Sequence, residues 1–176
     1  SLASGISKAK NLLMSEDVEA SIKAVRKLGV KVLIKGGVCT IHGVGMKGYK
    51  YKKNLIINAQ NSGTLGRLIS GILIDTPFPI KIIGDKSLSK RDFQRVTRPL
   101  SKFGASFRLT NKCNLPLTVK GSEKLKPIRF FEKKGSAQCK TSVMFAALKS
   151  FGTTEIKAKK SRNHTELLFK YLKIPI

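Results

Sequence analysis

The same short pattern recurs at the end of two predicted helices in this chain. Lys27-Leu28-Gly29-Val30 and Lys102-Phe103-Gly104-Ala105 each place a glycine after an amphipathic segment and before an apolar one. Glycine ends many helices because it adopts the left-handed conformation without a steric penalty. Each match alone is weak, since a glycine after a helix is common. The stronger constraint is the order of the elements around the two glycines.

Hydrophobic periodicity and turn residues predict one order of elements, used three times: helix, strand, helix and then a pair of strands. The predicted elements are a strand at 8–13, a helix at 15–28 and strands at 30–34 and 38–42; a helix from about 61, a strand at 78–83, a helix at 89–103 and strands at 105–110 and 115–120; and a helix after 135, a strand at 154–158 and a helix at 163–173. This alternation predicts an α/β fold in which helices pack against sheets.

The pattern also predicts where the copies begin and end. We expect a single domain over residues 1–176 that contains three repeats, at 1–54, 55–122 and 123–176. Residues 2–5 match residues 68–71, so they are expected to end a helix, and the first repeat is expected to be truncated at its start. The third repeat is expected to be truncated at its end, because no closing strand pair follows its second helix.

The composition is that of a folded domain. The chain has 176 residues, of which 41% are hydrophobic, and this is enough to bury a core. It has no apolar run near the roughly 20 residues of a membrane span, and it does not begin with a secretion signal. Three cysteines, Cys39, Cys113 and Cys139, form no CxxC pair. We therefore expect a soluble cytoplasmic protein with reduced thiols and no metal site.

The net charge of +25 allows several interpretations. A positive chain can bind nucleic acid by neutralising phosphates, and it can also steer small anions into a cleft. The lysines, however, are spread along most predicted elements, and the 7% of aromatic residues include no tryptophan that could stack on bases. A solvated lysine-rich surface explains the charge equally well, so charge alone does not select a function.

Two predicted helices begin with small and hydroxyl-bearing residues. Asn61-Ser62-Gly63-Thr64 precedes one apolar helical run, and Gly135-Ser136-Ala137-Gln138 precedes another. Free backbone N–H groups, hydroxyls and the positive end of a helix dipole favour an anion at such a place. The same residues also cap helices that bind nothing, so one such start would be weak evidence.

Four segments in one order resemble a known family. They are Asn61-Ser62-Gly63-Thr64 with Arg67, the segment 84–91 that ends in Ser-Lys-Arg, the segment 135–140, and Ser-Arg-Asn-His-Thr-Glu at 161–166. Together they resemble the bacterial type of 5-enolpyruvylshikimate-3-phosphate (EPSP) synthase, the 3-phosphoshikimate 1-carboxyvinyltransferase of aromatic amino acid biosynthesis. The resemblance covers essentially the whole chain. It implies one domain of a two-domain enzyme, each domain being three βαβαββ repeats.

The resemblance also implies roles for individual residues. Those implied for phosphoenolpyruvate are Asn61, Gly63, Thr64, Arg91 and Gln138, and those for shikimate 3-phosphate are Ser136, Ala137, Gln138, Ser161 and Arg162. A guanidinium suits the phosphoenolpyruvate role, since it binds phosphate and carboxylate with two parallel hydrogen bonds. Glyphosate is expected to compete at the phosphoenolpyruvate position.

The family pattern has parts that this chain does not contain. A Lys-Ser-Ser-His-Arg-like segment would precede residue 1, and the carboxylates used for proton transfer belong to the second domain. We therefore expect a domain fragment that binds small-molecule substrates, needs no cofactor and does not turn over alone, with the second domain as its partner and with no membrane or specific nucleic acid. The alternatives are a domain like UDP-N-acetylglucosamine enolpyruvyltransferase and a basic nucleic-acid-binding module.

Overall fold

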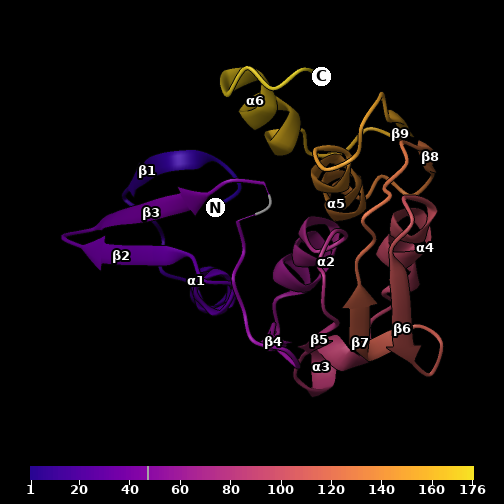
Figure 1. Cartoon of the computed structure of the whole chain (residues 1–176), viewed down its shortest axis with the longest axis horizontal. Helices are drawn as coiled ribbons and strands as arrows, with labels where there is room; N and C mark the ends of the chain where they lie inside the picture. The colour runs from indigo at the N-terminus through magenta and orange to yellow at the C-terminus, as the bar shows by residue number, and fades with distance from the viewer. Residues whose placement is uncertain (47) are drawn as a thin grey trace.

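The computed structural model describes residues 1–46 and 48–176 (Figure 1). The helices are α1 (Glu16–Lys27), α2 (Gly63–Ile72), α3 (Lys86–Ser89), α4 (Gln94–Lys102), α5 (Ala137–Ala147) and α6 (His164–Tyr171). The strands are β1 (Ser4–Lys10), β2 (Lys31–Lys35), β3 (Val38–Val44), β4 (Ile56–Asn58), β5 (Ile80–Ile83), β6 (Ser106–Thr110), β7 (Asn114–Lys120), β8 (Arg129–Glu132) and β9 (Glu155–Ala158). The predicted mixture of helices and sheets is confirmed.

The described strands form three sheets, and the pairings of the first and third sheets each correspond to part of the second. The first sheet has the order β1-β3-β2 and is antiparallel throughout, and the second has the order β4-β5-β7-β6. In the second sheet β4 is parallel to β5 and the other pairs are antiparallel, so β5-β7-β6 has the same order and orientation as β1-β3-β2. The parallel pair of β8 and β9 corresponds to β4 and β5. A repeated unit would produce these corresponding pairings. The division of the chain into three repeats, with boundaries after residues 54 and 122, stays a prediction.

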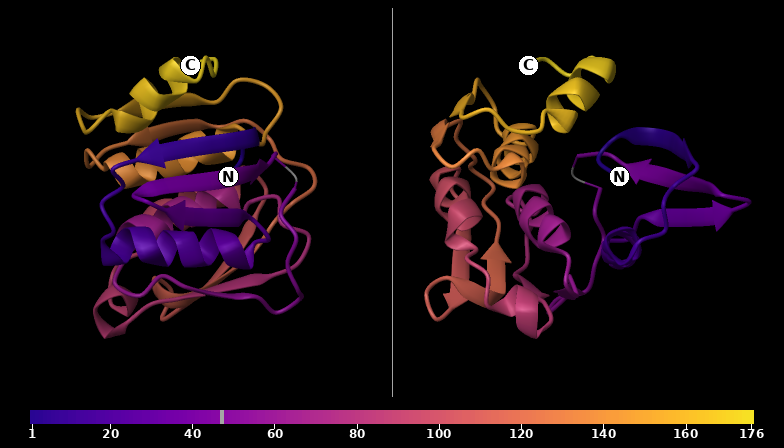
Figure 2. Two further views of the ribbon diagram at one scale, coloured as in Figure 1. Left: turned by 90° about the vertical axis from the view of Figure 1, so that its left-hand side faces the viewer. Right: turned by 180° about the vertical axis from the view of Figure 1, so that it is seen from behind.

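The first sheet and α1 stand to one side, and the other sheets surround α2, α4 and α5, as two opposite views show (Figures 1 and 2). The main core lies where β4, β5 and β7 meet these helices. The strands contribute the fully buried Ile57, Ile82 and Leu117 to this core. A smaller core lies between α1 and the first sheet, and it contains Ile22, Val30, Val32 and Cys39.

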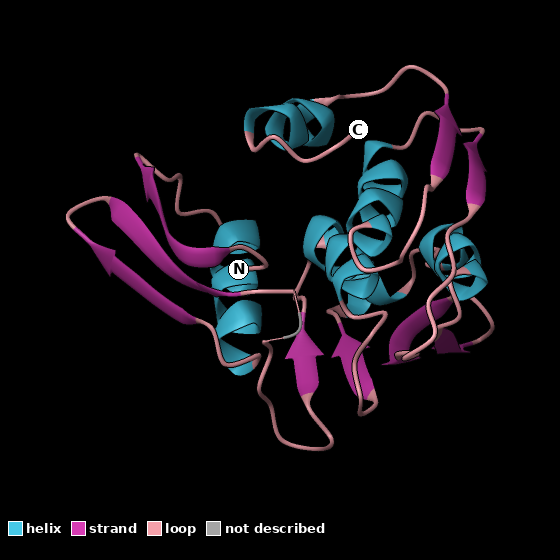
Figure 3. Ribbon diagram, turned by 45° about the horizontal axis from the view of Figure 1, so that its top comes forward, coloured by secondary structure: helices cyan, strands magenta, loops and turns pink. Residues whose placement is uncertain are grey.

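Helices α2 and α5 lie side by side at the centre of the molecule (Figure 3). Their backbones approach closely where Gly71 of α2 faces Ser142 of α5. A Cβ atom built on Gly71 would lie 2.1 Å from the Ser142 carbonyl oxygen, so no larger residue fits there without moving a helix. The Ser142 hydroxyl also donates a 2.8 Å hydrogen bond to the Arg67 carbonyl oxygen. The small residues at this contact therefore determine how closely α2 and α5 pack.

A buried ion pair joins α2, α5 and the segment after β3 at the opposite end from the helix N-termini. Lys149 Nζ lies 2.5 Å from Asp75 Oδ1 and donates to the Met46 carbonyl oxygen at 3.0 Å. Only 2% of the Lys149 side chain is exposed. Its ammonium also lies 5.6 Å from the centre of the Tyr49 ring, a distance that permits a cation–π contact.

Several predicted boundaries differ from the structure. Residues 2–5 do not end a helix, because β1 begins at Ser4 and pairs with β3, and because Gly5 has a φ of +82°. The strand predicted at 8–13 therefore starts earlier and ends at Lys10. The helix predicted at 89–103 starts later, as α4 at Gln94, and a separate short helix, α3, ends at Ser89. Just before α4, Asp92 Oδ1 accepts a hydrogen bond from Gln94 N at 2.7 Å.

Hydrophobic periodicity did not predict two short strands, β4 and β8. They have only 3 and 4 residues, which is too short for a clear period. Their partners β5 and β9 define them, and that pairing is a tertiary property. Within the described part of the chain, no helix is long and apolar enough to cross a membrane, and Cys39, Cys113 and Cys139 are free thiols.

Replacing Gly71 with alanine tests the close contact between α2 and α5. Alanine favours a helix interior over glycine by about 1 kcal/mol. The added methyl group would nevertheless push against the backbone of α5, and such overpacking costs about 1–3 kcal/mol. We expect Gly71→Ala to lower the free energy of unfolding in urea, whereas Ser101→Ala on the exposed side of α4 changes it little. An unfolding midpoint at or above that of the parent would contradict this packing argument.

Candidate functional site

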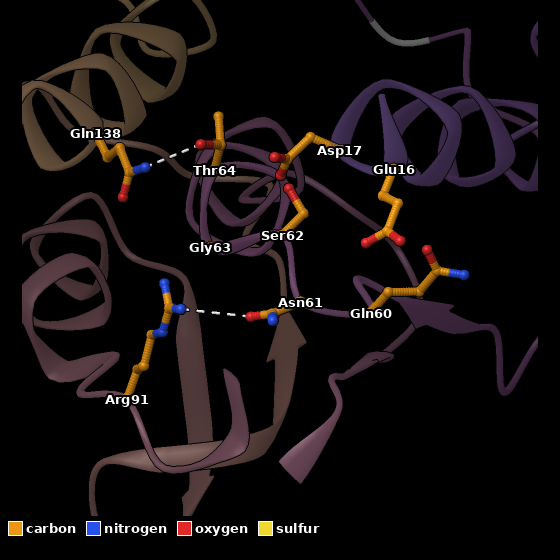
Figure 4. A pocket seen from close by; sticks show the side chains of 9 residues that line it. All are labelled: Glu16, Asp17, Gln60, Asn61, Ser62, Gly63, Thr64, Arg91 and Gln138. Carbon is orange, nitrogen blue, oxygen red and sulfur yellow. Dashed lines mark hydrogen bonds between the residues drawn. The ribbon is translucent and has the colours of Figure 1, made fainter. Parts of the chain in front are cut away.

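A cavity of about 360 Å³ lies at the N-terminus of α2, between α1, the end of α3 and the start of α5. It is lined by Glu16, Asp17, Gln60, Asn61, Ser62, Gly63, Thr64, Arg91 and Gln138 (Figure 4). These residues are far apart in the sequence. All five residues that the sequence resemblance implies for phosphoenolpyruvate, namely Asn61, Gly63, Thr64, Arg91 and Gln138, are among them.

The parallel pair of β4 and β5 brings two of these segments together. Parallel strands end at the same edge of a sheet, and ligands of α/β proteins commonly bind beyond the carboxyl ends of such strands. The loop after β4 carries Asn61 and Ser62, and the loop after β5 leads to Arg91. Asp85 N donates to the Gln60 carbonyl oxygen at 2.9 Å, which ties the two loops to each other.

Local hydrogen bonds shape the loop before α2. Asn58 Oδ1 accepts from Gln60 N at 2.8 Å, and Gln60 adopts a left-handed φ of +51°. Ser62 is the N-cap of α2, and its hydroxyl accepts from Leu65 N at 3.0 Å. Because the cap uses only one of the free N–H groups of the first turn, other N–H groups there remain for a ligand.

The loop before α5 has the same construction. Glu132, at the end of β8, is only 5% exposed, and its carboxylate accepts from Lys134 N at 3.2 Å and from Ser136 N at 2.7 Å. Ser136 is the N-cap of α5, and its hydroxyl accepts from Cys139 N at 3.3 Å. The glutamate therefore holds the loop in the conformation that α5 needs to start. Glu132 was not identified from the sequence, because no local pattern shows that a carboxylate at a strand end accepts hydrogen bonds from the next loop.

Gln138 joins the two helix starts. Its Nε2 atom donates to Thr64 Oγ1 at 2.9 Å, and its Oε1 atom accepts from Arg67 Nη1 at 2.5 Å. Thr64 and Arg67 lie one helical turn apart on α2, so the side-chain amide of Gln138 can form a hydrogen bond with each of them. The N-termini of α2 and α5, which the sequence indicated as favourable places for an anion, thus lie side by side.

Arg91 reaches the cavity from the loop after α3. Its Nη2 atom donates to Asn61 Oδ1 at 3.3 Å (Figure 4). A Cβ atom built on Gly63 would lie 3.2 Å from Arg91 Nη1 and 3.5 Å from Arg67 Nη1. The absence of a side chain at Gly63 therefore lets both guanidinium groups approach the start of α2.

Arg67 is a half-buried cation behind the cavity. Burial lowers the pKa of its guanidinium from the ordinary value, and the neighbouring Arg95 and Arg91 lower it further. Its Nε atom is buried and makes no hydrogen bond to any described residue, while the guanidinium carbon lies 5.5 Å from the centre of the Phe93 ring. An arginine keeps its charge at neutral pH despite such shifts. Arg67, Arg91 and Arg95 are thus neighbouring cations, and the cavity lining holds Arg91 together with the acidic Glu16 and Asp17.

The residues implied for shikimate 3-phosphate are grouped less tightly. Gln138 lines the cavity, Ser136 caps α5, and Ala137 is the first residue of that helix. Ser161 and Arg162 lie in the segment between β9 and α6, and the Arg162 carbonyl oxygen accepts from Lys140 Nζ at 3.1 Å. The Ser161 hydroxyl is buried and bonds to no described residue. This segment therefore contacts α5 about one turn beyond Ser136.

Sequence analysis missed part of the cavity lining. Glu16 and Asp17 were assigned only as the start of α1, where acidic residues favour the helix dipole. Nothing in the sequence placed α1 next to α2, so their contribution to the cavity comes from tertiary structure. Among residues 1–46 and 48–176, no group of three or more His, Cys, Asp or Glu side chains could hold a metal ion.

This arrangement has the chemistry of an anion site. The capped N-terminus of α2, the Arg91 guanidinium and the Gln138 amide of α5 line one cavity, Arg67 lies behind it, and the carboxylates of Glu16 and Asp17 lie on another side of it. Helix N-termini and arginines are the usual ligands of phosphate and carboxylate groups. A small phosphorylated or carboxylated molecule therefore fits the site better than an apolar one.

Comparisons with known proteins agree with this chemistry. The family model described as EPSP synthase (3-phosphoshikimate 1-carboxyvinyltransferase) matches residues 1–176. The protein named 3-phosphoshikimate 1-carboxyvinyltransferase from Streptococcus mutans is 45% identical over 172 residues, and the one from Streptococcus suis is 44% identical over 168 residues. These matches cover 97% and 94% of this chain but only 40% and 39% of the relatives.

A solved structure gives the same relation. EPSP synthase from Acinetobacter baumannii superimposes with a TM-score of 0.90 and 36% sequence identity, over 96% of this chain and 38% of that chain. The chain thus spans about 40% of the length of the curated relatives that it matches. Since the family model matches the chain from end to end, the chain belongs to the EPSP synthase (3-phosphoshikimate 1-carboxyvinyltransferase) family.

Proposed function

We propose that this chain is the shikimate-3-phosphate-binding part of a 3-phosphoshikimate 1-carboxyvinyltransferase. In this proposal the intact enzyme moves the enolpyruvyl group of phosphoenolpyruvate to shikimate 3-phosphate. The present chain would bind the two anionic substrates and would not complete the reaction alone. The observation that carries the proposal is the cavity where Gln138 bridges Thr64 and Arg67 while Arg91 faces Gly63.

Each group in the cavity has a task in this proposal. Arg91 would bind phosphoenolpyruvate through its guanidinium fork, and Arg67 would add charge behind it. Gln138 would lie between donor and acceptor, because its amide already joins the two helix starts. The start of α5, together with Ser161 and Arg162, would receive the phosphate of the acceptor. Each of these contacts fixes an anion, and such orientation lowers the barrier of a two-substrate reaction.

The remaining chemistry would require groups from the rest of the enzyme. A proton would add to the methylene carbon of phosphoenolpyruvate while the hydroxyl oxygen of the acceptor bonds to the enol carbon and gives up its own proton to a base. A second base would then remove a proton from the new methyl group as the C–O bond to phosphate breaks, which restores the C=CH2 group and releases phosphate. Proton transfer needs an acid or base within hydrogen-bond reach of the proton that moves. The proposed partner is a second domain of the same enzyme, which would close over both anions and exclude water. The proposed architecture of this part is one domain of three repeats, at 1–54, 55–122 and 123–176.

Titration of the chain with shikimate 3-phosphate, followed by amide NMR shifts, tests the proposed function. We expect saturable shifts at Ser136, Gln138 and Arg162, and further shifts at Gly63 and Arg91 when phosphoenolpyruvate is added. UDP-N-acetylglucosamine is the control for the alternative acceptor and should move none of them. Shifts caused only by the control, or by neither acceptor, would refute the assignment.

Arg91→Ala tests the guanidinium in the cavity. A charge-assisted hydrogen bond contributes about 1.5–3 kcal/mol, so we expect phosphoenolpyruvate to bind roughly 10- to 100-fold more weakly. Arg98→Ala is the matched control, because Arg98 is an exposed arginine of α4 that does not line the cavity. Calorimetry at fixed ionic strength measures both variants. Equal losses in the two would mean that only the general positive charge matters.

Gly63→Ala separates ligand binding from stability. Gly63 has no left-handed φ and is the first residue of α2, so alanine should leave the unfolding midpoint unchanged or raise it. Its methyl group would lie 3.2 Å from Arg91 Nη1 and would displace that guanidinium. We expect phosphoenolpyruvate binding to weaken by roughly 1 kcal/mol, about fivefold in Kd. Unchanged affinity in a folded variant would remove Gly63 from the site.

A further inference from the structure

A buried lysine, Lys140, connects α5 to the segment that precedes α6. Its side chain is 10% exposed, and its Nζ atom forms an ion pair with Glu166 and donates to the Arg162 carbonyl oxygen at 3.1 Å. The adjacent Thr141 shares a 2.7 Å hydrogen bond between hydroxyl groups with Thr165. The segment at residues 161–166 is thus tied to the first turns of α5 at three points.

These ties join the two parts of the proposed acceptor site. Lys140 lies one turn after Ser136, and its own backbone N–H donates to the Ser136 carbonyl oxygen at 3.1 Å. The side chain of Lys140 therefore links the N-cap of α5 to the segment of Ser161 and Arg162. Neither partner of the ion pair lines the cavity.

The ion pair between Lys140 and Glu166 is not expected to add much to the free energy of unfolding. Removing two charges from water is costly, and buried ion pairs are often no more stabilising than apolar residues of similar size. What such a pair can do better than apolar packing is hold one geometry. The buried Ser161 hydroxyl, which bonds to no described residue, would be left in reach of a ligand only if its segment is held in place.

We infer that Lys140 is a positioning residue that holds residues 161–162 against α5, so that the two parts of the phosphate site of the acceptor stay aligned. This inference rests on the proposed function. Lys140 acts through the Arg162 carbonyl oxygen and Glu166 and does not touch the substrate. Its charge is balanced by Glu166, so its contribution is geometric and does not add a third cation to the site.

Lys140→Met tests this role, with Lys149→Met as the matched control. Both lysines are buried, belong to α5 or the residues directly after it, and pair with one carboxylate and one carbonyl oxygen. Lys149, however, lies at the far end of α5 from the cavity. We expect both variants to lower the unfolding midpoint. Only Lys140→Met should weaken shikimate 3-phosphate binding at least fivefold and speed amide hydrogen exchange at residues 159–163.

The outcomes separate the inference from the proposed function. If the parent chain binds shikimate 3-phosphate and Lys140→Met binds it equally well, or if Lys149→Met weakens binding as much, the inference is wrong. If the parent chain shows no saturable binding, the proposed function fails and this role of Lys140 fails with it. Should Lys140→Met not fold, Glu166→Gln removes the charge partner of Lys140, and it should also speed exchange at 159–163. Unchanged exchange in that variant would overturn the inference.

Discussion

The close contact between Gly71 and Ser142 sets the geometry on which the rest of the structure depends. It allows the backbones of α2 and α5 to approach until a carbonyl oxygen of one helix fills the space of a side chain on the other. The Ser142 hydroxyl then bonds to the Arg67 carbonyl oxygen, and Gln138 spans the distance from α5 to Thr64. Because the helices are this close, Gln138 of α5 lines the same cavity as the N-terminus of α2. Wider packing would leave two separate helix caps with no common ligand.

The two N-termini are similar because each follows the same succession of strand, loop and helix. In both places a polar side chain at the strand end, Asn58 or Glu132, accepts a backbone N–H of the following loop. A serine, Ser62 or Ser136, then caps the helix with its hydroxyl. The parallel pairs of β4 with β5 and β8 with β9 extend the likeness to the sheets. The two helix starts differ in their cations: Arg67 and Arg91 lie beside the first, and Lys140 contacts the segment before α6 from the second.

The elements that were predicted correctly are those specified by residues close together in the sequence. The start of α1 at Ser15, the glycines after α1 and α4 and the strand pair of β2 and β3 are set by caps, turns and short-range periodicity, and the structure has them close to where they were predicted. The elements that were not predicted are those whose conformation depends on a partner segment elsewhere in the chain. β4 and β8 exist because β5 and β9 lie beside them, and residues 4 and 5 belong to a strand because β3 pairs with them. The late start of α4 lies beside Asp92, whose carboxylate accepts a hydrogen bond from Gln94 N that periodicity does not detect.

Residue types and short segments specify which residues can bind an anion: hydroxyls and small residues at two helix starts, and guanidinium groups nearby. Because these properties are local, they can be recognised in the sequence alone. Packing between distant segments selects which of these residues meet. It brought Gln138 to Thr64, Arg91 to Gly63 and Asn61, and Glu16 and Asp17 to the same cavity. The physical reason is that helix packing and parallel strand pairing act between segments far apart in the chain, where no local pattern specifies the partner.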